Sequence, residues 1–363
     1  MPASFPNIGN FCIGLKGFFE KLGVPMILPP PTTRRTIELG LKHSPEFVCF
    51  PYKVTMGCLI ELLEKKVDTI MMIGGGLGIC RLPSYGNLQE KTLKEMGYKV
   101  NFLLFNGFTL KRIFFKDLRK MAGNQKFYYF KLIRAIFFAR KKLILLDQVD
   151  KYARKIRPRE TKIGETTLAE KKSLKLIDGA KNMRDLRIAW KEIKKMFKNI
   201  RQDKNKEILR VSLGGEFFCV LEQYINLNIE EKLGNLGVEV IKDISPYELL
   251  KSALKINIKR KYLMIKGSEY LKVTSGGDDQ VTIGEIIVAA NKGYDGFIHL
   301  YPFQCMPENN AQATFPKIQK KYNIPILKFP IDEQTSDAGI QTRLEAFVDL
   351  MKRRKNKTKK IKI

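Results

Sequence analysis

Short apolar segments alternate with helical segments along most of this chain, and this alternation constrains its fold more than any other feature. Segments with strand character lie at 24–28, 67–73, 100–105, 207–213, 237–241, 295–300 and 324–329. Helical patterns separate them, among them 33–41, 58–66 and 88–96. Short strands separated by helices predict βαβ units and parallel sheets. We therefore expect an α/β fold made of two Rossmann-like, flavodoxin-like parallel-sheet halves.

Residues 109–203 interrupt this alternation. They are Lys-rich and helical in period, with a break expected between Pro158 and Gly164. A chain of 363 residues is also longer than one ordinary core organises. The predicted parts are an N-terminal α/β domain at 1–108, a basic helical insertion or linker at 109–203, a C-terminal α/β domain at 204–350 and a basic tail at 351–363.

Positive charge is concentrated in two segments of the chain. There are 66 Lys and Arg against 37 Asp and Glu, a net charge of +29. Residues 111–200 hold 27 Lys and Arg against 9 acids, and residues 351–363 hold 8 with no acid, so the remainder is close to neutral. Basic runs are usually solvated faces or disordered ends. No recognised nucleic-acid-binding module accompanies the charge, so we do not expect nucleic acid as a partner.

Aromatic and basic residues are mixed in residues 126–141. This mixture fits a surface that faces a membrane or the buried stripe of an amphipathic helix, and we favour the buried stripe. No apolar run reaches the roughly 18 residues that a membrane span requires. The first seven residues, Met-Pro-Ala-Ser-Phe-Pro-Asn, contain neither a basic nor an apolar leader region. We therefore expect a cytoplasmic protein whose thiols stay reduced.

Three of the six cysteines lie in separate turns rich in Gly or Pro. Cys49 is in Phe-Val-Cys-Phe-Pro, Cys80 follows Gly-Gly-Gly-Leu-Gly-Ile, and Cys305 is in Phe-Gln-Cys-Met-Pro. Their wide spacing does not fit a zinc knuckle or a ferredoxin run, whose ligands are clustered. Cys80 and Cys305 each follow an expected parallel strand, where open α/β sheets bind ligands. These three are candidate ligands of a metal centre, and the alternative is that they are ordinary buried thiols.

The other three cysteines lie within apolar or helical stretches. They are Cys12, Cys58 and Cys219. Because thiols are among the most frequently buried side chains, we expect these three to be core residues.

Three blocks of sequence carry a resemblance to a known superfamily. The first is Gly17-Phe-Phe-Glu-Lys-Leu-Gly23 with Cys49-Phe-Pro-Tyr, and the second is Gly214-Gly-Glu-Phe-Phe with Gly237-Val-Glu-Val. The third and most specific block is 296–308 followed by 332–347. These blocks resemble the 2-hydroxyacyl-CoA dehydratase subunit superfamily, which includes benzoyl-CoA reductase subunits. The chain is most similar to the stand-alone branch described as CoA-substrate-specific enzyme activase-related.

Members of that superfamily hold a 4Fe–4S cluster through three cysteines, matched here by Cys49, Cys80 and Cys305. The resemblance implies this cofactor in ATP-driven, low-potential electron transfer to an acyl-CoA or another small molecule. It also implies a separate ATP-hydrolysing activase as partner, together with a dehydratase-like partner subunit or a homodimer. Gly74–Gly78 is not followed by Lys-Ser/Thr, and no actin-like phosphate motif is present. We therefore do not expect this chain to be the ATPase.

Acidic residues expected near the proposed metal site are candidate acid–base groups. They are Glu216, Glu308, Asp332 and Glu333, and a surface or helix-capping role is the alternative for each. One position departs from the superfamily pattern, because Asp278 stands where a histidine is common. This departure places dehydratase activity in doubt but leaves the cluster prediction unchanged.

Arg81 lies directly beside Cys80. A cation there would raise a cluster's potential or bind an anion, or it would form a salt bridge with Glu90 or Glu308. Two further interpretations of the whole chain stay open. One is a non-enzymatic scaffold or binding protein of the same fold without a cluster. The other is a protein that associates with RNA or another anionic surface through its basic helices.

Overall fold

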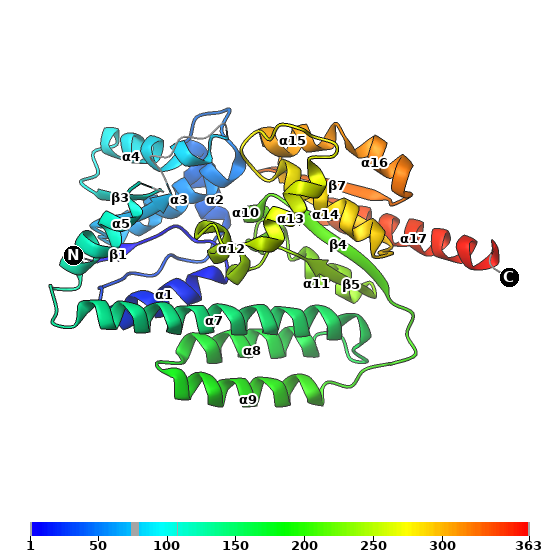
Figure 1. The fold of residues 1–363 in the computed structure, drawn as a ribbon, viewed down its shortest axis with the longest axis horizontal. Coiled ribbons are helices and arrows are strands. Elements are labelled where there is room, and N and C mark those ends of the chain that lie inside the picture. The colour runs from blue at the N-terminus through cyan, green and yellow to red at the C-terminus, as the bar shows by residue number, and fades with distance from the viewer. Residues whose placement is uncertain (1, 74–79, 107, 362–363) are drawn as a thin grey trace. The chain divides into compact units, whose positions relative to one another are not determined.

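The computed structural model describes residues 2–73, 80–106 and 108–361, which form two compact units. Unit 1 comprises residues 1–143 with 181–183, and unit 2 comprises residues 144–180 with 184–363. Each unit contains one sheet of parallel strands with helices packed around it (Figure 1). The predicted α/β class with two parallel-sheet halves is confirmed. The division into four parts expected from the sequence stays a prediction.

Unit 1 is built on a three-stranded sheet in the order β1-β2-β3. The strands are β1 (Ala3–Ser4), β2 (Thr69–Ile73) and β3 (Asn101–Phe105), and both pairings are parallel. Its helices are α1 (Phe11–Leu22), α2 (Arg34–Lys42), α3 (Phe50–Glu64), α4 (Tyr85–Glu95), α5 (Leu110–Arg112), a π-helical turn η2 (Ile113–Asp117), α6 (Leu118–Met121) and the first half of α7 (Tyr128–Ile156). A short 3₁₀ turn, η1 (Leu82–Ser84), precedes α4.

Side chains of strand β2 point alternately to the two faces of this sheet, and helices pack against both faces. Ile70 and Met72 pack into a core formed with α3 and α4. Met71, between them, packs into a second core with α1, α6 and α7. Successive side chains of a strand point to opposite faces, so an apolar run of this kind is buried on both sides. Unit 1 is therefore a doubly wound α/β unit.

The strand predicted at 24–28 is not a strand in the structure. Only Met26 forms a bridge, which pairs with Ala3. Proline at position 25 has no N–H to donate, and three prolines follow at 29–31. The two-residue strand β1 occupies the edge of the sheet beside β2, where Ala3 pairs with Thr69.

Unit 2 is built on a four-stranded parallel sheet in the order β5-β4-β6-β7. The strands are β4 (Leu209–Gly215), β5 (Val238–Lys242), β6 (Gly296–Pro302) and β7 (Ile326–Ile331), within two residues of the predicted starts. Its helices are the end of α7, a 3₁₀ turn η3 (Arg157–Arg159), α8 (Glu165–Gly179), α9 (Met183–Asn199), α10 (Phe217–Leu221), α11 (Ile229–Asn235), α12 (Pro246–Ala253), α13 (Ile258–Gly267), α14 (Asp279–Asn291), α15 (Met306–Gln312), α16 (Phe315–Tyr322) and α17 (Asp337–Ile361).

A buried cluster of charges fixes the end of α7 against β5 and α11. Lys242 of β5 lies 2.5 Å from Glu230 and 3.3 Å from Asp150. Arg154 contacts the same two carboxylates and donates a hydrogen bond to the Val240 carbonyl at 3.1 Å. Such a cluster adds little net stability over an apolar core, but loss of one partner leaves a buried charge uncompensated. The cluster therefore specifies how α7 packs in unit 2.

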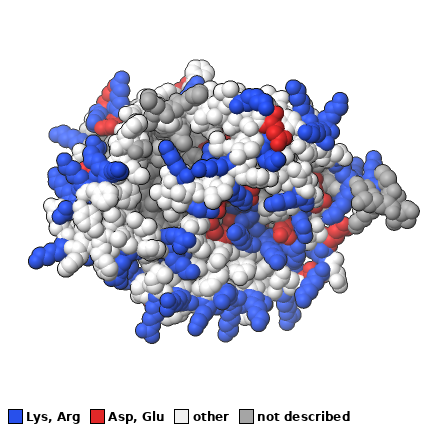
Figure 2. All heavy atoms as spheres, viewed as in Figure 1, with Lys and Arg blue, Asp and Glu red and all other residues white. Residues whose placement is uncertain are grey.

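Helices α8 and α9 lie alongside the second half of α7 (Figure 1). Tyr152 of α7 stacks on Trp190 at 5.8 Å and contacts Phe197 at 5.6 Å between ring centroids. The opposite face of α9 is basic, and Figure 2 shows Lys and Arg side chains in a row where α9 lies. This part of the predicted insertion has a buried apolar face and a solvated basic face, as the periodicity indicated.

The prediction that the aromatic residues of 126–141 form a buried stripe is wrong for several of them. Tyr128 and Phe138 are buried, as expected. Phe127, Phe130 and Phe137 are 80%, 60% and 63% exposed. The first half of α7 is apolar on two faces, and only one of them packs on the core of unit 1.

The described part of the basic tail is helical. Residues 351–361 continue α17, so the tail begins inside a 25-residue helix. Lys355 lies 3.7 Å from both Glu207 and Asp295, which attaches the start of this segment to unit 2. Over the described ranges, no helix combines the length and the apolar character needed to cross a bilayer.

The contact between α2 and α3 predicts a large effect of one added methyl group. A Cβ atom at Gly57 would lie 1.8 Å from the Thr36 carbonyl oxygen, and one at Gly40 would lie 1.8 Å from the Lys53 carbonyl oxygen. A backbone carbonyl cannot move aside as a flexible side chain can, so Gly57→Ala should destabilise unit 1 by about 3 kcal/mol or more. Urea denaturation, with hydrogen exchange of residues 34–64, measures the loss.

The control for this variant is Gly179→Ala, at the end of α8. A Cβ atom there meets nothing within 4 Å, so we expect a neutral or slightly stabilising effect of less than about 1 kcal/mol. Equal stability of the two variants would contradict the close approach of α2 and α3.

Candidate functional site

The carboxyl ends of the four parallel strands of unit 2 share one edge of the sheet, where α/β proteins bind ligands. Acidic residues immediately follow three of these strands: Glu216 follows β4, Asp243 follows β5 and Asp332 follows β7. Cys305 follows β6 and immediately precedes α15. The structure thus brings acidic groups and a thiol to the edge at which the sequence predicted a site.

Gly214 and Gly215 let β4 pass close to its neighbours before the chain turns. A Cβ atom at Gly214 would lie 2.0 Å from the Glu285 carboxylate, and one at Gly215 would lie 2.0 Å from the Leu300 carbonyl oxygen. Gly215 also has φ +123°, a conformation that side chains disfavour. The turn then places the Glu216 N–H on the Leu300 carbonyl at 2.9 Å. Two glycines are therefore required to position Glu216.

Glu216 is the N-cap of the short helix α10. Its carboxylate accepts a hydrogen bond from the Cys219 N–H at 3.0 Å, so the helix-capping role considered for it is present. Burial, with the nearby charge of Asp278, raises the pKa of Glu216 to about 7. Cys219 is fully buried. Burial raises the pKa of its thiol well above the ordinary value, and the proximity of Glu216 and Cys305 adds to the shift.

Glu308 and His299 form a fully buried pair on α15 and β6. The His299 Nε2 atom lies 2.6 Å from the Glu308 carboxyl, and Thr282 of α14 lies 3.0 Å from the same oxygen. His299 also stacks on Tyr301 at 4.6 Å. Burial raises the pKa of Glu308 well above the ordinary value and lowers that of His299 to about 3. The imidazole of His299 is therefore neutral at neutral pH, and burial favours the protonated form of Glu308.

Glu285 of α14 is a second buried acid at this edge. Its side chain packs on the backbone of Gly214, and neither carboxyl oxygen has a hydrogen-bond partner among the described residues. Burial raises its pKa well above the ordinary value, with Asp243 and Asp278 adding to the shift. A charged carboxylate without partners is costly to bury, so burial favours the protonated form of Glu285. The sequence offered no signal for it, because it sits in an apolar helical run.

The loop that departs from the superfamily pattern packs against α15. A Cβ atom at Gly277 would lie 2.5 Å from Pro307, and Asn310 donates a hydrogen bond to Ser275 at 2.7 Å. Asp278 forms an ion pair with Arg260 of α13. Position 278 is therefore occupied by a carboxylate that is paired with a guanidinium.

Asp332 serves a local turn. It accepts hydrogen bonds from the Gln334 N–H and the Thr335 hydroxyl, both at 3.0 Å. Glu333 is exposed beside it. These contacts give Asp332 a structural role in the connection between β7 and α17.

Cys49 and Cys80 both belong to unit 1. Cys49 is the N-cap residue of α3, and Cys80 is half-buried just before the turn that leads to α4. Arg81 donates a hydrogen bond to the Phe47 carbonyl, which brings the Cys80 segment to the Cys49 segment. Glu90, one salt-bridge partner considered for Arg81, pairs instead with Lys94 at 2.6 Å. The glycines at 74–78 lie outside the described residues.

Cys49 and Cys305 occupy equivalent positions at the starts of helices. Each is an N-cap residue in extended conformation, followed by Pro at the second helical position, and neither side chain caps its helix. Partial positive charge at a helix start favours a thiolate, which suits an iron ligand. Within residues 2–73, 80–106 and 108–361, no three His, Cys, Asp or Glu side chains are grouped to hold a metal ion. The three-cysteine site stays a prediction.

The remaining cysteines of unit 1 are structural. Cys58 is buried on α3 and accepts a hydrogen bond from the Asn7 N–H at 3.4 Å. Cys12 donates to the Asn7 side chain at 3.3 Å. Both thiols therefore contact the segment between β1 and α1. Cys58 is a core residue as expected, whereas Cys12 is only half-buried and packs against the edge of the core.

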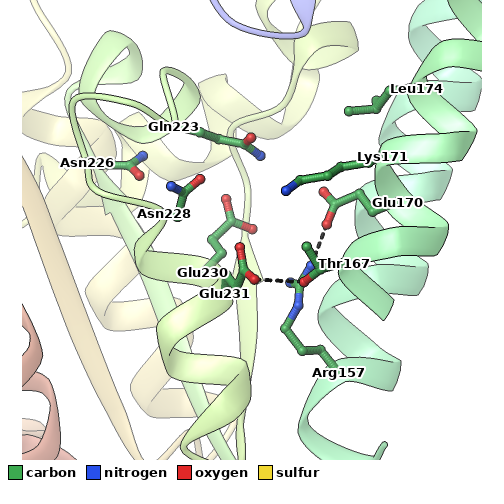
Figure 3. A pocket seen from close by; sticks show the side chains of 10 residues that line it. All are labelled: Arg157, Thr167, Glu170, Lys171, Leu174, Gln223, Asn226, Asn228, Glu230 and Glu231. Atoms are coloured by element: carbon green, nitrogen blue, oxygen red, sulfur yellow. Dashed lines mark hydrogen bonds and ion pairs between the residues drawn. The ribbon is translucent and has the colours of Figure 1, made fainter. Parts of the chain in front are cut away.

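Unit 2 contains a small polar pocket, drawn in Figure 3, with a volume of about 50 Å³. Its lining comprises Arg157, Thr167, Glu170, Lys171, Leu174, Gln223, Asn226, Asn228, Glu230 and Glu231. Arg157 pairs with Glu170, and the Thr167 hydroxyl donates to Glu231 at 2.9 Å. Pockets for organic ligands are several times larger, whereas this volume suits one or two water molecules. The pocket is too small to hold an acyl-CoA or a nucleotide.

The His299–Glu308 pair predicts a specific pH dependence of stability. The raised pKa of Glu308 keeps a proton on the folded state that the unfolded state loses above pH 4.5. The contribution of Glu308 to the free energy of unfolding should therefore fall as pH rises from 4.5 toward its folded-state pKa, by up to about 1.4 kcal/mol per pH unit. The lowered pKa of His299, about 3 in the folded state, has the opposite effect: its contribution should rise between about pH 3 and 6.5 and stay constant above that range.

Glu308→Gln tests this contribution, because glutamine preserves hydrogen bonding to Thr282 and removes the titrating proton. In urea denaturation from about pH 5 to 8.5, the free energy of unfolding of the wild type relative to this variant should fall as pH rises, because only the wild type carries the Glu308 proton. Glu333→Gln, at an exposed carboxylate, is the matched control and should keep the wild-type slope. An unchanged slope in Glu308→Gln would show that the buried pair carries no extra proton.

Residues 8–72 match a family model described as the CoA enzyme activase uncharacterised domain. The match covers about a fifth of the chain, includes Cys49 and ends before Cys80. A search of curated proteins finds no match to the chain. The relationship to CoA enzyme activases is therefore supported at this coarse level, through the segment that forms α1, α2, α3 and most of β2.

Proposed function

We propose that the chain holds a 4Fe–4S cluster through Cys49, Cys80 and Cys305 and takes part in low-potential electron transfer. The observation that carries the proposal is the hydrogen bond from Arg81 to the Phe47 carbonyl, which draws the Cys80 and Cys49 segments together. The family match at residues 8–72 supports the same assignment, because it includes Cys49 and relates the segment to CoA enzyme activases.

The surroundings of Cys305 suit a ligand of a low-potential cluster. Cys305 is 5% exposed and begins a helix. Cys305, Glu216 and Glu308 all lie near the buried thiol of Cys219. Burial of Cys305 disfavours the addition of an electron and lowers the reduction potential, whereas Arg81, beside Cys80, would raise it.

A cluster with one open iron would supply an electron or act as a Lewis acid toward a small molecule. The chain's own residues would supply protons. Glu216 stands at the carboxyl end of β4, and its pKa of about 7 suits transfer of a proton near neutral pH. Glu308, held neutral beside His299, maintains the packing of α15 against β6. The substrate class that fits this proposal is an acyl-CoA or another small molecule.

The electron would come from a separate ATP-hydrolysing activase. The sequence contains no phosphate-binding glycine motif followed by Lys-Ser/Thr, so the proposed role of this chain is that of electron acceptor. The basic face of α9 offers long-range attraction to an acidic partner. A dehydratase-like partner subunit or a second copy of the chain would complete the assembly.

One observation favours a different function. Cys49 and Cys305 are 9% and 5% exposed, which is ordinary for core thiols that bind nothing. A scaffold or binding protein of the same fold, without a cluster, is therefore the second candidate. The iron content of the protein separates the two.

Protein purified without oxygen should be brown and contain about four iron and four acid-labile sulfide per chain. Cys49→Ser, Cys80→Ser and Cys305→Ser should each lower the iron content severely, because each removes a thiolate ligand. Iron and sulfide analysis with visible spectroscopy is the measurement. Iron-free, colourless wild-type protein after anaerobic reconstitution would favour the scaffold function.

Cys58→Ser and Cys219→Ser are the matched controls, since both thiols are fully buried but neither is a proposed ligand. They should keep the iron content and lose only packing, about 1–3 kcal/mol. Loss of iron in Cys219→Ser, with iron retained in Cys305→Ser, would move the third ligand from α15 to α10.

Purified protein should neither bind nor hydrolyse ATP, because its sequence lacks a nucleotide-binding loop. Reduction of its cluster should require a very strong reductant or a separate activase with ATP. Isothermal titration with ATP and anaerobic spectroscopic titration are the measurements. Stoichiometric ATP binding, or rapid reduction by a ferredoxin without ATP, would place the energy-coupling role in this chain itself.

A further inference from the structure

The first half of α7 exposes apolar side chains although its other face is already packed. Tyr128, Leu132, Ala135, Phe138 and Ala139 are buried in the core of unit 1. The exposed apolar side chains of the same region are Phe127, Tyr129, Phe130, Ile133, Ile136 and Phe137. A helix that packs against a core requires only one apolar face. The second apolar face of this helix therefore has a different role.

Basic side chains are interleaved with these exposed residues. Residues 108–142 contain eleven Lys or Arg and a single acid, Asp117, which pairs with Arg112 at 3.4 Å. Arg134 lies 5.6 Å from the Phe130 ring centre, and Arg119 lies 5.7 Å from that of Tyr129. Figure 2 shows uncharged and basic surface with little acid where α7 begins, at the left of the view. The exposed side of residues 126–141 is called the basic-aromatic face below.

The helices before α7 extend this face. Phe115, in the π-helical turn, is 53% exposed and lies 5.8 Å from Tyr129 between ring centroids. Aromatic side chains thus continue from one helical segment to the next instead of ending at the edge of α7. Contiguous exposed apolar surface of this kind marks an interaction site.

We propose that the basic-aromatic face binds the surface of an anionic lipid bilayer, with α7 lying parallel to the membrane plane. Phe130, Ile133 and Phe137 would enter the boundary between headgroups and acyl chains. Lys and Arg would extend their stems along the apolar layer and place their charges among anionic headgroups.

The composition of the face favours lipid over other anionic partners. RNA is bound by aromatic side chains that stack on bases, but Ile133 and Ile136 have no ring to stack. An acidic protein would be bound through charge alone, and that binding would not require three exposed phenylalanines. The row of basic residues on α9 carries charge without a comparable aromatic cluster, so it serves as an internal comparison.

The test is flotation of the purified full chain with vesicles of phosphatidylcholine alone and with roughly a third phosphatidylglycerol. Binding should require the anionic lipid and weaken as salt rises, since screening removes the electrostatic part. Lys126→Glu with Arg134→Glu should weaken binding by more than about tenfold, because each charge near the surface contributes. Phe130→Ser with Phe137→Ser should weaken it by about tenfold through lost apolar insertion.

Two matched controls use equal changes elsewhere. Lys191→Glu with Lys195→Glu changes the charge by the same amount on α9, and Ile258→Ser with Ile265→Ser removes two exposed apolar residues of α13. Both should retain wild-type binding. Equal loss in the α9 variant would show attraction by net charge without a specific face and would overturn the proposal.

A tryptophan reporter separates insertion into lipid from binding to another polyanion. Trp190 is the only tryptophan, so Phe137→Trp in a Trp190→Phe background reports on the face alone. Its fluorescence should shift to the blue with anionic vesicles and should not shift with a single-stranded RNA. Binding to RNA through these residues, with no binding to vesicles, would make the face an RNA site and overturn the membrane proposal.

Discussion

The close packing of β4 against β6 and α14 is the constraint on which the candidate site of unit 2 depends. Gly214 pairs with His299 across the two strands, and the carboxyl of Glu285 rests on the Gly214 backbone. Any side chain at Gly214 or Gly215 would separate these elements. The same two glycines therefore set the position of Glu216, the burial of Glu285 and the environment of the His299–Glu308 pair.

The strands of both sheets could be predicted because each is a short apolar run between helices. Strand β6 is buried along all seven residues, so its apolar pattern is continuous and easily seen. Strand β1 could not be predicted, since it has only two residues and forms through pairing with β2 and a bridge to Met26. Tertiary contacts, absent from the local sequence, define it.

The candidate site was predictable at the level of position but not of environment. The rule that ligands bind at strand carboxyl ends placed Cys305 at that edge of the sheet, where the structure also has it. It did not reveal that Glu308 contacts His299 or that Glu285 lies beside Gly214, because both contacts depend on strand register and helix rotation. The periodicity also predicted an amphipathic α7. Because α7 is apolar on two faces, the sequence alone does not reveal which of them packs against the core.

Basic surface residues and buried acids occupy different parts of this protein. The net charge of +29 resides mainly on helices and on the last turns of α17, whereas the carboxyl edge of the unit 2 sheet is lined by acids. Several of these acids are neutral because burial raises their pKa values. The basic surface attracts anionic partners over a distance. Salt screens this surface charge, so its electrostatic effect on the distant buried acids is small. Neutral buried acids avoid the cost of unpaired charge while keeping protons close to a thiol. The surface and the buried edge can therefore serve different partners, because the electrostatic properties of one need not change those of the other.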